Sequence, residues 1–207
     1  MIVISSGHSL TILGASELIS EAEENRRVVK RVVEYLRSGG VDVIEFHEDL
    51  AISGPANLNN IIAFHNSQQR DLDVSVHFNS VGGGMREAGI GTEVLYFSAQ
   101  ELATRVSAAV AKAGGFINRG AKKRTDLGFL SRTTKPAIII EVCFVVSRTD
   151  VRLYQENFEA ICHAIAESIS GEKIAKKPVT VKRWYEDEEK RKRVSDLLDS
   201  LYEVIRG

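Results

Sequence analysis

A few reactive side chains stand directly after, or inside, short apolar stretches of the chain. His8 follows "IVISSG", His77 ends "DVSVH", and Glu141 interrupts "AIIIEVCFV". A carboxylate flanked by apolar residues on both sides is very costly to bury without a hydrogen-bonding partner or a cation. Glu141 is therefore the strongest single indication of a functional site in this sequence.

Two imidazoles and one carboxylate form a ligand set used by catalytic zinc, which leaves its fourth position for water. His8 and His77 would supply the imidazoles, and Glu21, in the opening turn of a helix that begins near Ser20, would supply the carboxylate. Glu141 would then take the proton from the water. Each residue also has a structural interpretation, since single histidines commonly form structural hydrogen bonds and Glu21 could simply complement the helix dipole.

Three further histidines compete for the ligand roles. His65 and His163 lie within helical patterns, and His47 lies in the acidic stretch "EFHEDL". We interpret these three as structural or surface residues.

Short apolar runs that alternate with helical patterns must position these groups. Strands are predicted at 2–5, 41–46, 73–78, 92–97 and 137–145, and helices at 23–38, 56–69, 98–115 and 149–170. The alternation indicates an α/β fold with a mostly parallel, mixed sheet flanked by helices on both faces. Ligands of such sheets bind beyond the carboxyl ends of strands, where His8, His77 and Glu141 fall.

Composition excludes several classes of protein. Lys and Arg total 27 against 28 Asp and Glu, so no overall basic field favours nucleic acid as a partner. The two cysteines, Cys143 and Cys162, lie inside apolar runs and cannot build a disulfide framework or a zinc ribbon. The first residues lack the pattern of a signal peptide and no stretch is long enough for membrane insertion, so we expect synthesis in the cytoplasm.

The amino-acid composition becomes polar and Lys-rich from about Gly171. We expect a catalytic domain over 1–170, a polar Lys-rich linker over 171–183 and one amphipathic C-terminal helix over 184–207. This helix is too short to fold alone as a further domain. It could dock on the core, pair with another chain or be the remnant of a lost targeting module. We favour a homo-oligomer, because pairing would raise avidity for a polymer.

Several motifs together resemble one family. "GHS", "SEAEEN", "SVHFNS", "GTEVLYF" and the stretch 118–145 occur in this order and look like the zinc-dependent N-acetylmuramoyl-L-alanine amidases of the Amidase_3 family, particularly the catalytic domains of phage endolysins. The resemblance covers about residues 1 to 170. One departure is Ser5-Ser6-Gly7-His8-Ser9, where most cell-wall members have Asp-Pro-Gly-His-Gly.

The resemblance implies one zinc ion per chain, held by His8, Glu21 and His77, with Glu141 catalytic. Glu17, Glu23 and Glu24 lie close to Glu21 in the sequence, and Glu21 is chosen because the family's glutamate precedes a helix-borne asparagine by four places, which Asn25 matches. The implied reaction is hydrolysis of the amide bond between N-acetylmuramic acid and L-alanine in bacterial peptidoglycan.

The implied setting is lysis of the cell wall. A bacteriophage or prophage endolysin without a signal peptide would reach the wall after a holin opens the membrane. A host autolysin or a sporulation enzyme would instead act during cell lysis. The sequence favours neither setting.

Substrate contacts are expected from a basic segment beside the proposed base. The stem peptide carries carboxylates, and the candidates that could bind substrate are Asn79, Arg119, Lys122 and Arg132. Equally, the basic segment could be a solvated loop, and Asn79 could have a structural role.

Two other functions remain open at this point. Another zinc peptidase acting on wall peptides could use similar ligands, although aminopeptidases usually need a second metal ion, and Glu93 is the only additional acidic residue at a strand end. A non-catalytic wall-binding relative would be favoured if one of the four key residues were replaced, and none is.

Overall fold

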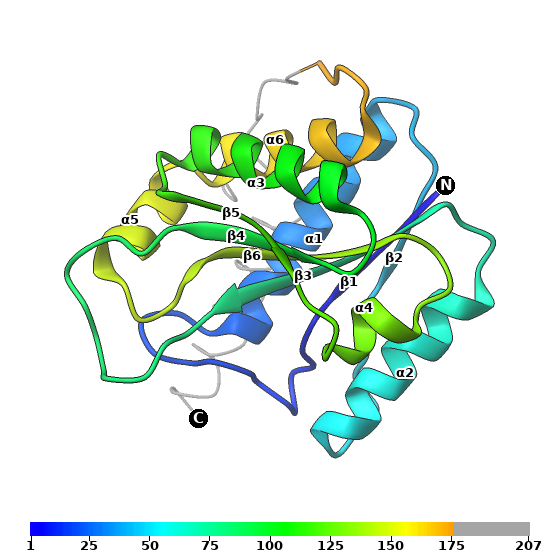
Figure 1. Cartoon of the computed structure of the whole chain (residues 1–207), viewed down its shortest axis with the longest axis horizontal. Helices are drawn as coiled ribbons and strands as arrows, with labels where there is room; N and C mark the ends of the chain where they lie inside the picture. The colour runs from blue at the N-terminus through cyan, green and yellow to red at the C-terminus, as the bar shows by residue number, and fades with distance from the viewer. Residues whose placement is uncertain (176–207) are drawn as a thin grey trace, which may run out of the picture. The chain divides into compact units, whose positions relative to one another are not determined.

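A six-stranded mixed sheet forms the centre of residues 1–175, the part of the chain that the computed structural model describes (Figure 1). The strands are β1 (Ile2–Ser6), β2 (Val43–Phe46), β3 (Leu72–Asn79), β4 (Thr92–Tyr96), β5 (Asn118–Lys123) and β6 (Ala137–Phe144). Their order is β2-β1-β3-β6-β4-β5, and all neighbours run parallel except β4 and β6. The prediction of a mostly parallel, mixed sheet is confirmed.

Helices cover both faces of the sheet, as predicted. They are α1 (Glu21–Ser38), α2 (Gly54–Ser67), α3 (Gln100–Gly114), α4 (Gly128–Arg132), α5 (Arg148–Glu156) and α6 (Phe158–Ser170). Helices α1, α3 and α6 lie over one face of the sheet, and α2 and α4 lie over the other (Figure 1). Side chains of the first group belong to the larger apolar core, and those of the second group belong to a smaller one. None of the described helices is long and apolar enough to cross a membrane.

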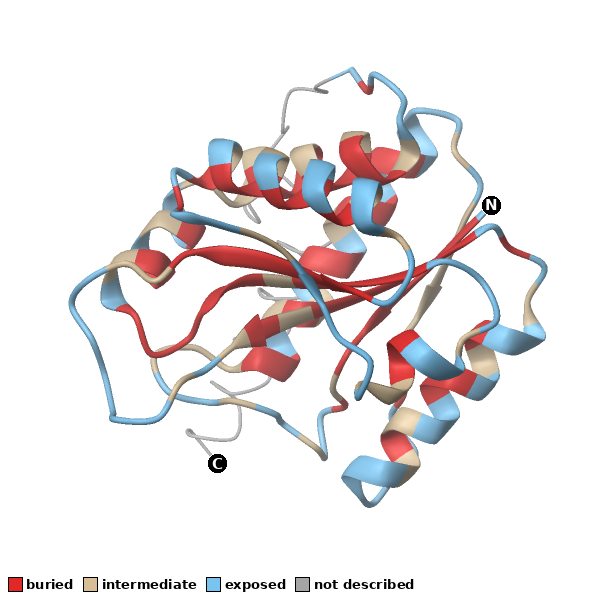
Figure 2. Ribbon diagram, viewed as in Figure 1, coloured by how far each residue is buried: buried red, intermediate tan, exposed pale blue. Residues whose placement is uncertain are grey.

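The alternation of side chains along β6 explains how an acidic residue enters an apolar strand. Ile138 and Ile140 belong to the larger core, and Ile139 belongs to the smaller core under α2 and α4. The strand is therefore apolar on both faces, and its residues are almost all buried (Figure 2). Because side chains alternate between faces, Glu141 lies on the same face as Ile139, one step further toward the carboxyl end.

The basic segment between β4 and β6 contains more regular structure than the sequence predicted. It forms β5 and the short helix α4. The strand reads "NRGAKK", which lacks apolar alternation, because β5 is an edge strand that pairs only with β4. Charged residues are typical of such edges, where they discourage pairing with other chains.

The long helix predicted over 149–170 is divided into α5 and α6. Asn157 stands between the two helices, and its Nδ2 donates a hydrogen bond to the carbonyl of Leu153 at 3.0 Å. Asparagine side chains compete in this way with the helical hydrogen-bonding pattern.

The C-terminal predictions fall mostly outside the described residues. Of the linker predicted over 171–183, the structure describes 171–175, where Ile174 is buried and its carbonyl accepts a hydrogen bond from His163 Nε2 at 2.7 Å. The rest of the linker and the helix predicted over 184–207 lie outside the described part of the chain.

Candidate functional site

His8, Glu21 and His77 meet at the carboxyl ends of β1 and β3. Each offers one ligand atom, and these atoms lie within 4.8 Å of one another. His8 lies in the loop after β1, Glu21 is the first residue of α1, and His77 lies near the end of β3. The structure thus brings together three groups that are far apart in the chain, in an arrangement that could hold one metal ion.

Backbone and side-chain hydrogen bonds fix the carboxylate of Glu21. Its Oε1 lies 3.0 Å from His77 Nδ1 and accepts a hydrogen bond from the Phe78 amide at 3.1 Å, and its Oε2 accepts one from the Ala15 amide at 2.7 Å. Only 4% of Glu21 is exposed. The carboxylate is therefore held in one orientation beside the histidines.

The other glutamates considered for this role lie elsewhere. Glu17 and Glu23 are exposed, and Glu24 accepts hydrogen bonds from Arg27 and from the hydroxyl of Tyr154. Of these acidic residues, the structure places only Glu21 with His8 and His77.

Two glycines allow the backbone to approach this cluster closely. A Cβ atom on Gly7 would lie 1.9 Å from His77 Nε2, and one on Gly14 would lie 2.4 Å from Glu21 Oε2. Gly14 also has a φ angle of 66°, which side-chain-bearing residues rarely adopt. Both positions require glycine because the ligand side chains occupy the space.

The electrostatics of the cluster favour a cation. Burial and the neighbouring His77 lower the pKa of His8, which keeps that imidazole neutral. Burial by itself would raise the pKa of Glu21, but the hydrogen bond and charge of His77 lower it. Burial opposes a charge on His77, yet its bond to Glu21 and the charge of Glu141 raise its pKa. Metal ligation needs neutral imidazoles and an ionised carboxylate, so a metal ion would replace the His77 proton.

Glu141 lies beside the cluster, across the pairing of β3 with β6, where it is directly opposite His77. Its Oε2 is buried and has no hydrogen-bond partner among the described residues. Burial raises the pKa of Glu141 to about 7, the charge of His77 opposes the shift, and the charges of Glu21 and Glu93 add to it. A carboxyl group with such a pKa can both accept and donate a proton near neutral pH.

The polar residues continue across the sheet beyond Glu141. Glu93 of β4 is directly opposite Glu141 in the antiparallel pair. Its Oε1 accepts a hydrogen bond from Asn79 Nδ2 at 3.0 Å, and its Oε2 accepts one from Arg119 Nε at 2.7 Å. We call His77, Glu141, Glu93 and Arg119 the strand-end row, because they occupy one level of four neighbouring strands.

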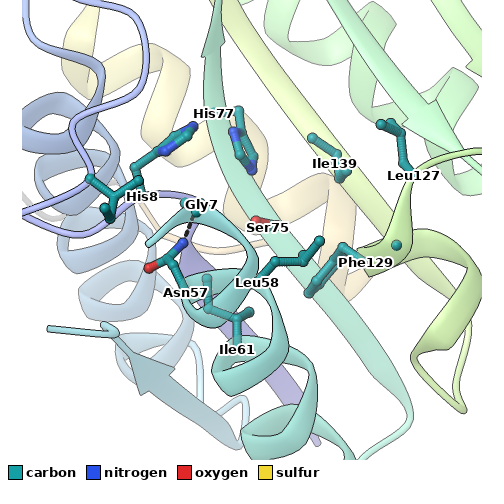
Figure 3. Close-up of a pocket in the computed structure, with 13 residues that line it drawn as sticks. Gly7, His8, Asn57, Leu58, Ile61, Ser75, His77, Leu127, Phe129 and Ile139 are labelled. Carbon is teal, nitrogen blue, oxygen red and sulfur yellow. Dashed lines mark hydrogen bonds between the residues drawn. The ribbon is translucent and has the colours of Figure 1, made fainter. Parts of the chain in front are cut away.

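A cavity of about 270 Å³ opens beside His8 and His77, between the sheet and the helices α2 and α4 (Figure 3). Its apolar wall is formed by Ile12, Leu58, Ile61, Leu127, Phe129 and Ile139. An apolar cavity that meets a few convergent polar groups is typical of a small-molecule or substrate site.

Comparison with known families decides the class of protein. Residues 2–171 match Amidase_3, a family described as N-acetylmuramoyl-L-alanine amidase. The chain belongs to the Amidase_3 family. The resemblance noted from the sequence motifs is therefore confirmed.

Individual proteins and solved structures are also similar to this chain. An uncharacterized protein of Clostridium perfringens, CPE1502, is 31% identical over 182 residues, which cover 84% of this chain and 52% of that protein. The chain spans about half the length of the curated relatives it matches. The catalytic domain of the CD27L endolysin, described as targeting Clostridia Difficile, is 28% identical with a TM-score of 0.73, covering 84% of this chain and 98% of that domain.

A third match is the N-acetylmuramoyl-L-alanine amidase AmiC2 of Nostoc punctiforme. It is 25% identical with a TM-score of 0.69, and the match covers 83% of this chain and 96% of AmiC2. The amidase fold thus extends over nearly all of the described residues.

Other residues singled out in the sequence lie outside the cluster of this amidase-family domain. Lys122 is exposed on β5, and Arg132 is exposed at the end of α4, where its Nη1 donates to Asn59 Oδ1 at 2.9 Å. His65 is buried, with Nδ1 2.8 Å from Asp73 and Nε2 3.0 Å from Ser5.

The remaining two histidines also have partners elsewhere. His47 Nδ1 lies 3.0 Å from Ser6 Oγ and its Nε2 lies 3.0 Å from Glu45, whereas His163 bonds to the Ile174 carbonyl. Neither belongs to the cluster formed by His8, Glu21 and His77.

The sequence analysis assigned no role to Glu93. The sequence pattern that indicated a role for Glu141 is also present for Glu93, because "TEVLYF" places an acidic residue in an apolar strand. The close approach of Gly7 and Gly14 gave no signal in the sequence, because it depends on where β3 and α1 lie in the fold.

Proposed function

We propose that this chain hydrolyses the amide bond between N-acetylmuramic acid and L-alanine in bacterial peptidoglycan. His8, Glu21 and His77 would hold one zinc ion, and Glu141 would serve as the acid and base. The observation that supports this most directly is the three-ligand cluster beside a buried, unpartnered carboxyl oxygen of Glu141 in a chain of the amidase family.

The residues present fit a zinc ion. Two imidazoles and a carboxylate are a donor set of catalytic zinc, and the carboxylate is already fixed by the amides of Phe78 and Ala15. When bound, zinc polarises a carbonyl group and lowers the pKa of water from about 15.7 toward 7.

The side chains would then perform the proton transfers. In its ionised form, Glu141 would accept a proton from the attacking water, whose oxygen bonds to the carbonyl carbon of the lactyl group. The C–N bond breaks, and Glu141 returns the proton to the nitrogen of L-alanine, which leaves as an amine. Proton transfer of this kind typically contributes about a hundred- to ten-thousand-fold to the rate.

The surroundings of the cluster would bind the substrate. The apolar cavity is lined in part by His77, and the strand-end row extends from His77 across β6, β4 and β5. The hydrogen bond between Asn79 and Glu93 supports a positioning role for Asn79, because its amide is already engaged. Arg132 and Lys122 would contact only parts of the glycan or peptide that lie far from the scissile bond.

The biological setting that we propose is lysis of the cell wall by a phage or prophage endolysin that reaches the wall through a holin. The similarity to the CD27L catalytic domain supports it. The C-terminal segment 184–207 would pair two chains. If a truncated chain ending near Gly171 sediments as the full chain does, pairing through this segment is wrong.

The decisive experiment is mass spectrometry of purified peptidoglycan digested by the full chain, before and after treatment with a chelator and after zinc is restored. An amidase releases stem peptides with free L-alanine amino termini and leaves intact muramic acid, whereas a peptidase releases amino acids from the stem. Glu141→Gln should bind zinc stoichiometrically and release neither product. If wild-type protein loaded with zinc releases no product, a non-catalytic wall-binding role replaces the proposal.

A further inference from the structure

We infer that Arg119 is a specificity residue that binds a carboxylate of the stem peptide. This inference rests on the proposed function and names one of its substrate contacts. The guanidinium of Arg119 donates through Nε to Glu93 at 2.7 Å and lies over the ring of Phe144 at 5.1 Å. Its two terminal nitrogens have no hydrogen-bond partner within residues 1–175, and 38% of the side chain is exposed.

The Nε bond and the aromatic contact fix the plane of the guanidinium. Glu93 binds only the Nε of Arg119. The N–H donors of the two terminal nitrogens therefore point away from Glu93. A planar guanidinium presents such donors in the geometry that matches a carboxylate, and a group that is already ordered loses little conformational freedom on binding. Arg119 therefore has the properties of a prepared carboxylate site.

An irregularity in the strand pairing brings Arg119 to this position. The register between β4 and β5 shifts between Thr92 and Val94, and Gly120 has a φ angle of 79°. Bulges with a glycine of positive φ redirect the neighbouring side chain and are common beside active sites. Here Arg119 is the neighbouring side chain, and it is directed to Glu93.

The distance from the metal cluster suits a short peptide. Arg119, Glu93, Glu141 and His77 belong to four neighbouring strands. Strands lie about 4.8 Å apart, so the backbones of Arg119 and His77 are separated by roughly 14 Å, and the guanidinium is several ångströms closer because it bonds to Glu93. An extended peptide covers about 3.3–3.6 Å per residue, which places a carboxylate on the second or third residue of the stem within reach.

Charge also favours such a group. Glu141 and Glu93 are directly opposite each other, and their negative charges would repel a carboxylate of the substrate unless a cation such as Arg119 offset them. The charge of Arg124 lowers the pKa of Glu141, but its Nε and Nη2 already donate to Asp126 at 2.8 and 2.7 Å, so these donors are not available to a substrate carboxylate. Arg132, at the end of α4, donates a hydrogen bond to Asn59 of α2.

The test uses two soluble N-acetylmuramoyl dipeptides that differ in one group of the second residue, a free carboxylate or its carboxamide. In the zinc-loaded full chain, Arg119→Gln should lower kcat/KM for the carboxylate substrate by about 10- to 100-fold, mainly through KM, because a charge-assisted bidentate contact is lost. For the carboxamide substrate the change should be less than about threefold. Arg124→Gln, which removes the same charge at the opposite end of β5, should change neither value by more than about threefold.

Two results would overturn the inference. One is an equal loss on both substrates in Arg119→Gln, which indicates a structural role for Arg119. The other is a loss of kcat/KM for the carboxylate substrate in Arg124→Gln that equals the loss in Arg119→Gln. This result would indicate that positive charge in general, and not a contact with Arg119, attracts the substrate. If Arg119→Gln does not fold, Arg119→Lys replaces it as the test variant, because lysine keeps the positive charge but lacks the planar guanidinium that matches a carboxylate.

A binding measurement separates this inference from the proposed function. Calorimetric titration of the carboxylate and carboxamide compounds into Glu141→Gln, and into Glu141→Gln with Arg119→Gln, needs no turnover. The carboxylate compound should bind about 10- to 100-fold more weakly to the double variant, and the carboxamide compound equally to both. If wild-type protein hydrolyses neither compound but this difference appears, the proposed reaction fails while the carboxylate site stands.

Discussion

His77 Nδ1 lies 3.0 Å from Glu21 Oε1, so that the end of β3 is joined to the first residue of α1. The same oxygen accepts the amide hydrogen of Phe78. One buried carboxylate therefore orients an imidazole, satisfies a strand amide and begins a helix. A metal ion bound here would use a ligand whose position is set by the backbone.

Loss of Glu21 should remove the metal. In Glu21→Ala we expect zinc affinity to fall by more than the roughly 10- to 100-fold typical of a partner outside the coordination sphere, because a direct ligand is lost. Competition against a chelator, with zinc content measured by mass spectrometry, checks this. Glu23→Ala, two residues along the same helix and exposed, is the matched control and should bind zinc as wild type. Equal affinities in both variants would remove Glu21 from the ligand set.

The glycine before His8 should be as important as a ligand. A methyl group on Gly7 would lie 1.9 Å from His77 Nε2, so Gly7→Ala forces the imidazole to move. A displacement of about 1 Å at a reacting centre can cost about 100-fold in rate, and we expect a loss of that order in amide hydrolysis. Gly82→Ala adds the same methyl group where no atom lies within 4 Å, and should be close to neutral. Near-normal turnover by Gly7→Ala would contradict the observed packing.

The pKa of Glu141 gives a pH-dependent stability in the metal-free protein. Since burial raises this pKa from an ordinary 4.5 to about 7, the folded state binds the proton more tightly than the unfolded state does. The associated stabilisation is complete below the unfolded pKa and is lost as the pH rises through about 7. At about 1.4 kcal/mol per pKa unit, this corresponds to about 3 kcal/mol.

Urea denaturation of chelator-treated wild type and Glu141→Gln at pH 5 and pH 8 measures this effect. Glu141→Gln should become more stable relative to wild type as the pH rises. A difference in unfolding free energy that stays constant over this range would show that Glu141 keeps its ordinary pKa.

A buried charge pair far from the cluster should stabilise the fold. Asp73 accepts hydrogen bonds from Arg70 at 2.7 and 2.8 Å and lies 2.8 Å from His65. Burial opposes the charge of Asp73, but His65 and Arg70 lower its pKa below the ordinary 3.8. Asp73→Asn leaves the buried Arg70 without its counter-ion, and we expect a loss of about 3–5 kcal/mol at pH 7.

The sign of the pH dependence follows from the lowered pKa. The stabilisation by Asp73 is present above the unfolded pKa and is lost as the pH falls through the lower folded pKa. Thermal or urea denaturation should therefore show the difference between Asp73→Asn and wild type shrinking below about pH 4. Asp42→Asn, at an exposed position, is the control and should have little effect at either pH. A difference that is unchanged at pH 3 would contradict this assignment.

The sequence predicted the site better where a strand is apolar than where it is polar. The short, mainly apolar runs that contain His77 and Glu141 made these polar groups conspicuous. All five predicted strands are present, as β1, β2, β3, β4 and β6. β5 was missed because its sequence has no apolar alternation, and α4 because five residues give too little periodicity.

Contacts between distant segments could not be predicted from local pattern. The approach of Gly14 to Glu21, and the bulge that turns Arg119 toward Glu93, depend on the way the strands are ordered in the sheet. Arg119 was among the predicted substrate contacts, but its pairing with Glu93 near the amino ends of β4 and β5 had no signal in the local sequence.

Because β4 runs antiparallel to β6, the amino ends of β4 and β5 lie at the same edge of the sheet as the carboxyl ends of β1, β3 and β6. The groups that would perform hydrolysis lie after β1 and in the carboxyl-terminal halves of β3 and β6. Those that would contact the peptide come from the beginnings of β4 and β5, after the connections 80–91 and 115–117. Those connections can change in length and composition without altering the segments that supply His8, His77 or Glu141. Under the proposed function, selection for a different wall chemistry would act on these two connections while the segments that carry His8, His77 and Glu141 are inherited unchanged.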